Sequence, residues 1–205
     1  MTLKEHIEKY GDIPLTKPKG VSQDQWKRAL DLYQVAKNKG DRYPELTVAQ
    51  AALETAWFKK PAGQYNYFGQ KASKNQRGTS VSTREVANNK SFRTKAKFRD
   101  YDSLDDAVDD RINKWSSKYS NAPDINQAIS SIWQYDAKTG RGRGYATDDK
   151  YDVKLKSILG MMGVPSDHKG AKDSVVSSRE NYPTVAIDNT RVNSPRIPSL
   201  ATQPI

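Results

Sequence analysis

The stretch Gln50-Ala51-Ala52-Leu53-Glu54-Thr55-Ala56-Trp57 places one carboxylate among small and apolar residues. Thr47 precedes Gln50 by three residues, which is the spacing of a capping box, and Pro61-Ala62-Gly63 follows as a helix stop. This pattern predicts a helix over about 48–58. Segments with the same helical spacing occur on both sides of it, so we expect this helix to pack among others in a mainly α fold.

Caps and apolar spacing predict four more helices. They begin after Ser22, Ser103, Asp124 and Thr147. The first has a capping box and covers about 23–39, and the helix after Asp124 is expected to include Trp133.

Between these helices the apolar period changes to two over 79–101, which is typical of strands. Asn88-Asn89 in the middle of this segment supplies turn residues, so we expect a β-hairpin. The predicted fold is therefore mostly helical, with one small inserted hairpin.

Composition narrows the possible chemistry. The chain has 205 residues, a formal net charge of 34 − 24 = +10, no Cys and two His, His6 and His168. Disulfides and thiolate chemistry are thus excluded, and a His-based zinc site or a Ser-His-Asp triad is nearly so. The sequence shows neither a long apolar run nor an apolar segment after its first charges, so we expect no membrane span and no Sec signal. The remaining candidates for chemistry are carboxylates, hydroxyls and cations.

The two ends of the chain differ from its middle. We expect a short N-terminal arm over 1–20, one domain over 21–163, and an extended polar tail over 164–205. The tail is rich in Ser, Pro, Asn, Asp and Thr and has no sustained apolar period. Our hypothesis is that it lies along other subunits of a large assembly.

Glu54 is the first candidate functional residue. Its neighbours within one helical turn are aliphatic or aromatic. Burial against such groups disfavours the charged form and raises a carboxyl pKa, which is how a general acid is made at neutral pH. The alternative is a Glu on the solvent side of an amphipathic helix.

Glu85 is the second candidate, for the opposite reason. Between residues 59 and 99 there are 11 basic residues, and Glu85 is the only acidic one. Nearby cations favour the ionised carboxylate. Cleavage of a glycosidic bond uses one carboxyl that is neutral and one that is ionised. The alternative is a solvated cross-strand partner of a Lys or Arg.

Other acidic and glycine-rich segments are assigned no role in chemistry. The Asp pairs at 105–106, 109–110 and 148–149 lack the pattern of a calcium loop, and those at helix starts complement the helix dipole. The segment 139–144 alternates Gly with Arg but lacks the Lys-Ser/Thr pair of a phosphate-binding loop. It is interpreted as a flexible basic loop.

Five segments in order over about 22–163 together resemble glycoside hydrolase family 73, the endo-β-N-acetylglucosaminidases. They are Gln50-Ala51-Ala52-Leu53-Glu54-Thr55-Ala56-Trp57, Tyr65-Asn66-Tyr67-Phe68-Gly69-Gln70-Lys71-Ala72, Thr83-Arg84-Glu85, Phe98-Arg99-Asp100-Tyr101, and Gly144-Tyr145-Ala146-Thr147-Asp148 with Tyr151 and Leu155. The resemblance implies a lysozyme-like α+β fold with a small β-lobe. It also implies cleavage of peptidoglycan between N-acetylglucosamine and N-acetylmuramic acid, without metal or cofactor.

The same resemblance implies roles for individual residues. Glu54 matches the general acid and Glu85 the second carboxylate, on the β-lobe. Asn66, Tyr67 and Phe68 match a segment that walls the cleft, and Tyr145 matches a tyrosine that lines the sugar site.

The chain departs from the family pattern in two places. Thr55-Ala56-Trp57-Phe58 stands where Ser-Gly-Trp-Gly is usual, and the stretch 135–143 is longer and more basic than expected.

The expected function is peptidoglycan hydrolysis by a virion-associated member of this family, carried in a phage tail or ejected. The expected partners are glycan strands and, through the arm and tail, other virion subunits. The expected location is a phage particle that acts in the host periplasm or cell wall.

Three alternatives remain open. The first is a structural or wall-binding virion subunit that does not cut glycan, which a cleft blocked by Phe58 or by the long loop would favour. The second is a lytic transglycosylase. The third is a nucleic-acid-binding protein, suggested by the net charge but without a helix-turn-helix, zinc module or RNP motif. Because the charge excess is concentrated in 59–99, we expect it to attract the anionic wall and expect no specific nucleic-acid partner.

Overall fold

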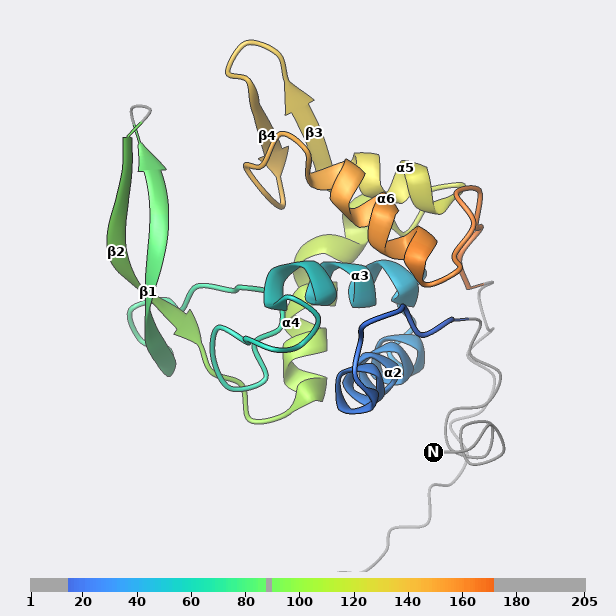
Figure 1. Ribbon diagram of the computed structural model, residues 1–205, viewed down its shortest axis with the longest axis horizontal. Coiled ribbons are helices and arrows are strands. Elements are labelled where there is room, and N and C mark those ends of the chain that lie inside the picture. Colours follow the sequence, from blue (N-terminus) through green and yellow to red (C-terminus); the bar gives the residue numbers. More distant parts are fainter. Residues whose placement is uncertain (1–14, 88–89, 172–205) are drawn as a thin grey trace, which may run out of the picture. The chain divides into compact units, whose positions relative to one another are not determined.

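The computed structural model describes residues 15–87 and 90–171, and it describes side chains for 15–82 and 95–171. Five helices and two antiparallel strand pairs occur in these residues (Figure 1). The elements are α2 (Gln23–Asn38), α3 (Pro44–Thr55), β1 (Gly78–Ala87), β2 (Lys90–Arg99), α4 (Leu104–Tyr119), α5 (Ile125–Ile132), β3 (Trp133–Asp136), β4 (Arg141–Gly144) and α6 (Tyr151–Met161). The mainly α fold with a β-hairpin is confirmed. None of the described helices is both long and apolar enough to cross a membrane.

Helix α3 lies at the centre of the helical core, between α2 and α6 (Figure 1). Ten of its twelve residues are buried, Leu53 is half-buried, and Glu54 is exposed. A helix that is buried on all sides forms the middle of a core. The one exposed residue of α3 is therefore its carboxylate.

The predicted limits of α3 are wrong at both ends. The helix begins at Pro44, because proline fits the first helical position, and Thr47 lies inside it, with its hydroxyl donating to the Asp41 carboxylate. At the other end Ala56, Trp57 and Phe58 have φ angles of 50°, 60° and 63°, which stops the helix at Thr55. Thr47 is therefore not a cap, since its hydroxyl donates to the carboxylate of Asp41, six residues earlier.

The predicted caps at Ser22, Ser103 and Asp124 are confirmed, whereas the helix expected after Thr147 begins at Tyr151 without a side-chain cap. Ser22 and Gln25 form a full capping box at the start of α2. The Ser103 hydroxyl accepts from the Asp106 N–H at the start of α4, and Asp124 accepts from Gln127 N–H at the start of α5.

The β1–β2 hairpin is confirmed, with a register that runs from Gly78 opposite Arg99 to Ala87 opposite Lys90. Its predicted turn, 88–89, lies outside the described residues.

A second hairpin corrects the prediction of a flexible loop over 139–144. Helix α5 ends at Ile132, and Trp133, expected in that helix, begins strand β3, which pairs with β4. The Asp136 carboxylate holds the two strands together by accepting from the Arg143 Nε at 2.7 Å. The alternation in β3 covers only four residues, and β4 consists of Arg and Gly without an apolar residue, so periodicity could not find this hairpin.

A buried ion pair joins α4 to the segment before α3. The Arg111 guanidinium and the Asp41 carboxylate are both fully buried and lie 3.1 Å apart. Arg111 also donates to the Gln50 Oε1 in α3 and to the Tyr119 hydroxyl.

Parts of the predicted arm and tail pack on this domain. The Thr16 N–H donates to the Met162 carbonyl, the Ile125 N–H to the His168 carbonyl, and the Ala171 N–H to the Arg42 carbonyl. Residues 1–14 and 172–205 lie outside the described part of the chain.

Candidate active site

Glu54 occupies the last turn of α3, where the buried helix reaches the surface. Its side chain is accessible to solvent, yet the protein around it is dense enough for desolvation to raise the pKa of the carboxyl to about 7. The negative charge of Asp148 is the second cause of this shift. Accessibility and a raised pKa together make Glu54 a carboxylic acid that can reach a substrate while holding its proton near neutral pH.

Asp148, to which the sequence analysis assigned no role, supplies the negative charge that acts on Glu54. It forms an ion pair with Lys154 and accepts a hydrogen bond from the Lys150 N–H at 3.0 Å. The hydrogen bond from Lys154 is the main cause that lowers the pKa of Asp148, so its carboxylate stays ionised beside Glu54. Its position directly after Tyr145-Ala146-Thr147, in a segment already assigned to the site, was the available signal.

Gly69 brings the segment 66–70 against the acid. A Cβ atom at position 69 would lie 3.4 Å from the Glu54 Oε2, and the residue has a φ of +62°, which favours glycine. Glycine at this position therefore leaves the carboxyl uncovered.

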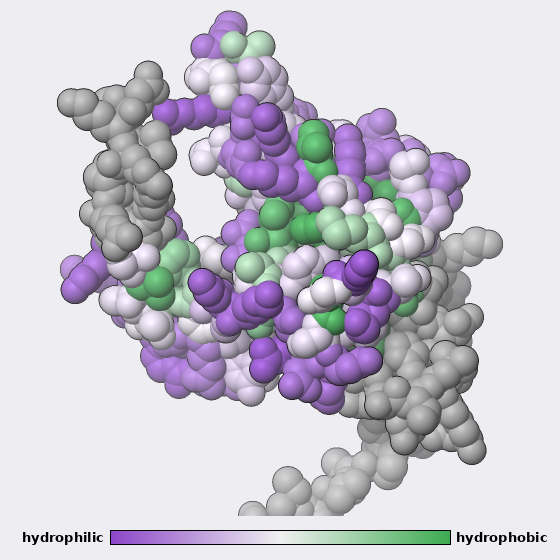
Figure 2. Space-filling model, in the orientation of Figure 1, coloured by the Kyte–Doolittle hydropathy of each residue, from purple (hydrophilic) through white to green (hydrophobic). Residues whose placement is uncertain are grey.

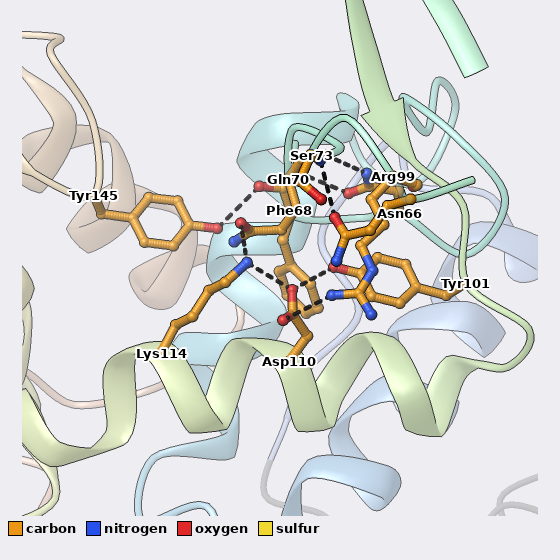
Figure 3. A network of polar contacts seen from close by, with 10 residues as sticks. Asn66, Phe68, Gln70, Ser73, Arg99, Tyr101, Asp110, Lys114 and Tyr145 are labelled. Carbon is orange, nitrogen blue, oxygen red and sulfur yellow. Dashed lines mark hydrogen bonds and ion pairs between the residues drawn. The ribbon is translucent and has the colours of Figure 1, made fainter. Parts of the chain in front are cut away.

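Asn66 holds that segment in shape (Figure 3). It is fully buried, and its amide donates to the carbonyls of Gln70 and Arg99, both at 2.8 Å, and accepts from the Gln70 N–H at 3.0 Å. These bonds join the loop beside Glu54 to the end of β2. Asn66 thus supports the wall of the site from behind.

The two aromatic residues that follow lie differently. Phe68 is buried, and the Arg111 guanidinium lies over its ring at 5.8 Å from the centroid. Tyr67 is half-buried and packs edge-on against Phe58, with 5.3 Å between ring centroids. Of the three predicted wall residues, Tyr67 is the one with surface available to a ligand.

Tyr145 closes the wall from the other side. Its hydroxyl donates to the Phe68 carbonyl at 3.2 Å (Figure 3), and its ring stacks on Tyr151 at 5.7 Å and lies 5.0 Å from Trp115. Burial, followed by the charge of Glu54, raises the pKa of Tyr145, so the phenol stays protonated. The structure therefore brings Glu54, Gly69 and Tyr145 to one place.

The β1–β2 hairpin is attached to α4 close to this wall (Figure 3). Asp110 in α4 pairs with Arg99 at 3.0 Å and with Lys114 at 2.8 Å, and it accepts from the Tyr101 hydroxyl at 2.6 Å. Lys114 also donates to the Gln70 Oε1. The end of β2 and the loop beside Glu54 are thereby held on the same helix.

Glu85 lies in β1 opposite Phe92, but its side chain is outside the described residues. Its role as the second carboxylate stays a prediction. Among the side chains that the structure describes, no group of three or more His, Cys, Asp or Glu is placed to hold a metal ion.

The unusual turn after Thr55 does not obstruct the site. Phe58 is fully buried, its N–H donates to the Thr55 hydroxyl, and its carbonyl accepts from Arg28. The Trp57 carbonyl accepts from the Gln25 side chain at 2.6 Å. Left-handed backbone is costly for non-glycine residues, and these bonds hold the turn in place. The Phe58 ring is thus directed into the core and away from a substrate.

A buried central helix that presents a carboxyl with a raised pKa beside a β-hairpin lobe and a tyrosine-lined wall defines a glycosidase domain of the lysozyme-like class. Residues 30–163 match the glucosaminidase family, described as mannosyl-glycoprotein endo-beta-N-acetylglucosaminidase. The chain belongs to this family.

Two curated proteins similar to this chain are a peptidoglycan hydrolase and a glucosaminidase. The chain is 35% identical over 130 residues to peptidoglycan hydrolase FlgJ of Escherichia coli K12, covering 60% of this chain and 41% of FlgJ. It is 29% identical over 128 residues to exo-glucosaminidase LytG of Bacillus subtilis, covering 57% of this chain and 43% of LytG. The chain thus spans about two fifths of the length of these relatives.

Solved structures confirm the fold. The catalytic domain of the autolysin Auto from Listeria monocytogenes superposes with a TM-score of 0.53 at 25% identity, covering 78% of this chain and 94% of that domain. A C-terminally truncated glycoside hydrolase domain of Salmonella typhimurium FlgJ gives a TM-score of 0.50 at 28% identity, covering 67% and 95%.

Proposed function

We propose that this protein hydrolyses the glycan backbone of peptidoglycan, at the bond between N-acetylglucosamine and N-acetylmuramic acid. The observation that carries the proposal is Glu54, an accessible carboxyl at the end of a buried helix with a pKa raised to about 7. The similarity to FlgJ and LytG, named as a peptidoglycan hydrolase and an exo-glucosaminidase, supports the choice of substrate.

In the proposed mechanism Glu54 donates its proton to the glycosidic oxygen as the bond breaks through an oxocarbenium-like transition state. Asp148 stays ionised and favours the protonated form of Glu54 before the reaction. Glu85 on the β1–β2 hairpin is the proposed second carboxylate, which activates water or stabilises the developing positive charge.

Analysis of the new chain ends tests the bond that is cut. Purified peptidoglycan is digested, the products are reduced with borohydride, and the reduced sugar is identified by mass spectrometry. We expect N-acetylglucosaminitol. N-acetylmuramitol would assign the other glycosidic bond, anhydro-muramic products would indicate a lytic transglycosylase, and binding without any product would indicate a wall-binding subunit.

We also propose that the protein reaches the wall as part of a phage particle, in the tail or as an ejected protein. The support for this is the composition of the tail, in which the segment 164–205 has five basic and four acidic residues and five prolines. Such a segment suits extended binding along neighbouring subunits. We expect the full chain to copurify with intact particles and to be lost from particles when 172–205 is deleted; recovery only from the lysate supernatant would contradict this.

A further inference from the structure

The β3–β4 hairpin has no role in the proposed mechanism. It leaves the helical core between α5 and α6 (Figure 1). Residues 133–144 contain three cations, Lys138, Arg141 and Arg143, and one carboxylate, Asp136, for a net charge of 3 − 1 = +2. The question is what this short charged hairpin binds.

Hydrogen bonds attach the base of the hairpin to the turn that carries Asp148. The Trp133 Nε1 donates to the Asp148 carbonyl at 3.1 Å, and the Gly142 N–H donates to the Thr147 carbonyl at 3.2 Å. A Cβ atom on Gly142 would lie 2.0 Å from the Trp133 Nε1, so glycine is required for this close approach. The position of the hairpin is thereby tied to the same turn as the charge beside Glu54.

One face of the hairpin offers an aromatic surface. The register places Tyr135 opposite Gly142 and Trp133 opposite Gly144, so the two aromatic residues share a face on which the facing strand has no side chains. Trp133 is buried, whereas Tyr135 is 55% exposed. The space over Gly142 is filled by the Trp133 ring, so the aromatic surface open to a ligand is the exposed Tyr135 ring, whose flat face suits a sugar ring.

The three cations of the hairpin differ in their ion pairs: Arg143 has a carboxylate partner, whereas Lys138 and Arg141 have none among the described residues. Asp136 is committed to the hairpin, since its carboxylate pairs with Arg143 and accepts from the Lys138 N–H at 3.0 Å. Neither Lys138 nor Arg141 forms an ion pair with a described residue, and both are exposed. A surface hollow of about 390 Å³ lies beside Tyr135 and Lys138. Arg141 lies opposite Asp136 in the register, so its side chain is on the other face of the hairpin from Tyr135. Lys138 is therefore the available cation beside the Tyr135 ring and the hollow, and this pair fits a ligand that combines a sugar with a carboxylate.

From this arrangement we infer that the β3–β4 hairpin is a second binding site, which holds a peptide-bearing sugar of the same glycan strand at a distance from the cleaved bond. Tyr135 packs against the sugar, while Lys138 binds a carboxylate of its attached peptide. Figure 2 shows that hydrophilic residues cover much of this face of the protein, which suits a polar polymer. The inference rests on the proposed function, because it takes peptidoglycan as the substrate.

The test uses the full-length chain and two variants, Tyr135→Ala and Lys138→Gln. Substrates are soluble glycan strands with their peptides and the same strands freed of peptide by an amidase. We expect Lys138→Gln to raise KM on peptide-bearing strands up to about fivefold, as for an exposed ion pair, with kcat unchanged and no effect on bare strands. Tyr135→Ala should raise KM on both substrates, roughly tenfold, through loss of aromatic contact.

Lys27→Gln serves as the matched charge control, because Lys27 is an exposed cation paired with Asp31 in α2. It should leave both KM values as in the wild type. Equal KM values for all variants on peptide-bearing strands would overturn the inference, as would a charge effect of the same size in Lys27→Gln.

A binding assay separates this inference from the proposed function. Retention of the variants on insoluble peptidoglycan is measured in the Glu54→Gln background, where no cutting is expected. If the wild type cuts no glycan but the hairpin variants still bind less, the proposed function fails and the hairpin site stands. If the wild type cuts glycan and the hairpin variants bind equally well, the hairpin site fails alone.

Discussion

Replacing Glu54 with Gln is expected to reduce the release of reducing sugar from purified peptidoglycan by about 10²- to 10⁴-fold, which is the usual contribution of a general acid. The amide keeps the size of the side chain but has no acidic proton to give to the leaving oxygen. The measurement is the rate of reducing-sugar release at pH 6, where the wild-type carboxyl, with a pKa of about 7, is mostly protonated.

Thermal unfolding provides the control for this variant. Folding raises the pKa of the Glu54 carboxyl, so the folded protein loses stability as the pH rises from the pKa of the unfolded state, about 4.3, through the pKa of the folded state. Gln carries no charge at any pH, so the variant should melt at least as high as the wild type at pH 8. A folded variant that retains near wild-type activity would remove Glu54 from the mechanism.

The same pKa sets the pH dependence of the wild type. Activity that requires a protonated Glu54 should fall as the pH rises through about 7. Asp148→Asn removes a negative charge that raises this pKa, so the alkaline limb should move to lower pH. Asp152→Asn, which removes a carboxylate paired with Lys156 in α6, is the matched control and should leave the limb in place. If the alkaline limb of the pH–activity profile stayed in place in Asp148→Asn, the charge of Asp148 would not act on Glu54.

Replacing Arg111 with Leu is expected to lower the free energy of unfolding by about 3–5 kcal/mol, because Asp41 is then left as a buried charge without its cation. The change also removes the donor that holds Gln50 in α3. Since small domains are stable by only about 5–15 kcal/mol, this is a large fraction of the total. The measurement is the midpoint of urea unfolding, with the slope checked for constancy.

Lys114→Gln is the matched control on the same helix. Lys114 pairs with Asp110 at the surface, and exposed pairs contribute less than about 1 kcal/mol. If Lys114→Gln and Arg111→Leu lowered the free energy of unfolding by similar amounts, burial would not determine the cost of breaking an ion pair.

Most of the helical fold could be predicted because its signals are local. The side chains of Ser22, Ser103 and Asp124 bond to backbone groups three residues away, and these contacts are already present in the sequence spacing. The β1–β2 hairpin was likewise predictable, from its alternation and its turn residues.

Two elements were mispredicted because contacts outside the cap and alternation patterns determine them. Thr47 has the spacing of a cap, but its hydroxyl donates to Asp41, six residues earlier, and Pro44 starts the helix. The alternation of β3 covers only four residues, and bonds from Trp133 and Gly142 to the 147–148 turn hold the β3–β4 hairpin in place.

For the site, the sequence by itself determined the family, the position of Glu54 on a helix among apolar neighbours, and the residues of the adjoining wall. Only the tertiary structure decided that Glu54 is the one exposed residue of α3 and that Asp148 lies close enough to act on it. It also decided that Asn66 and Phe68 support the wall from inside the core. The reason is physical: desolvation and Coulomb interactions depend on which groups surround a carboxyl, and the folded chain brings residues 54, 69 and 148 together from separate segments.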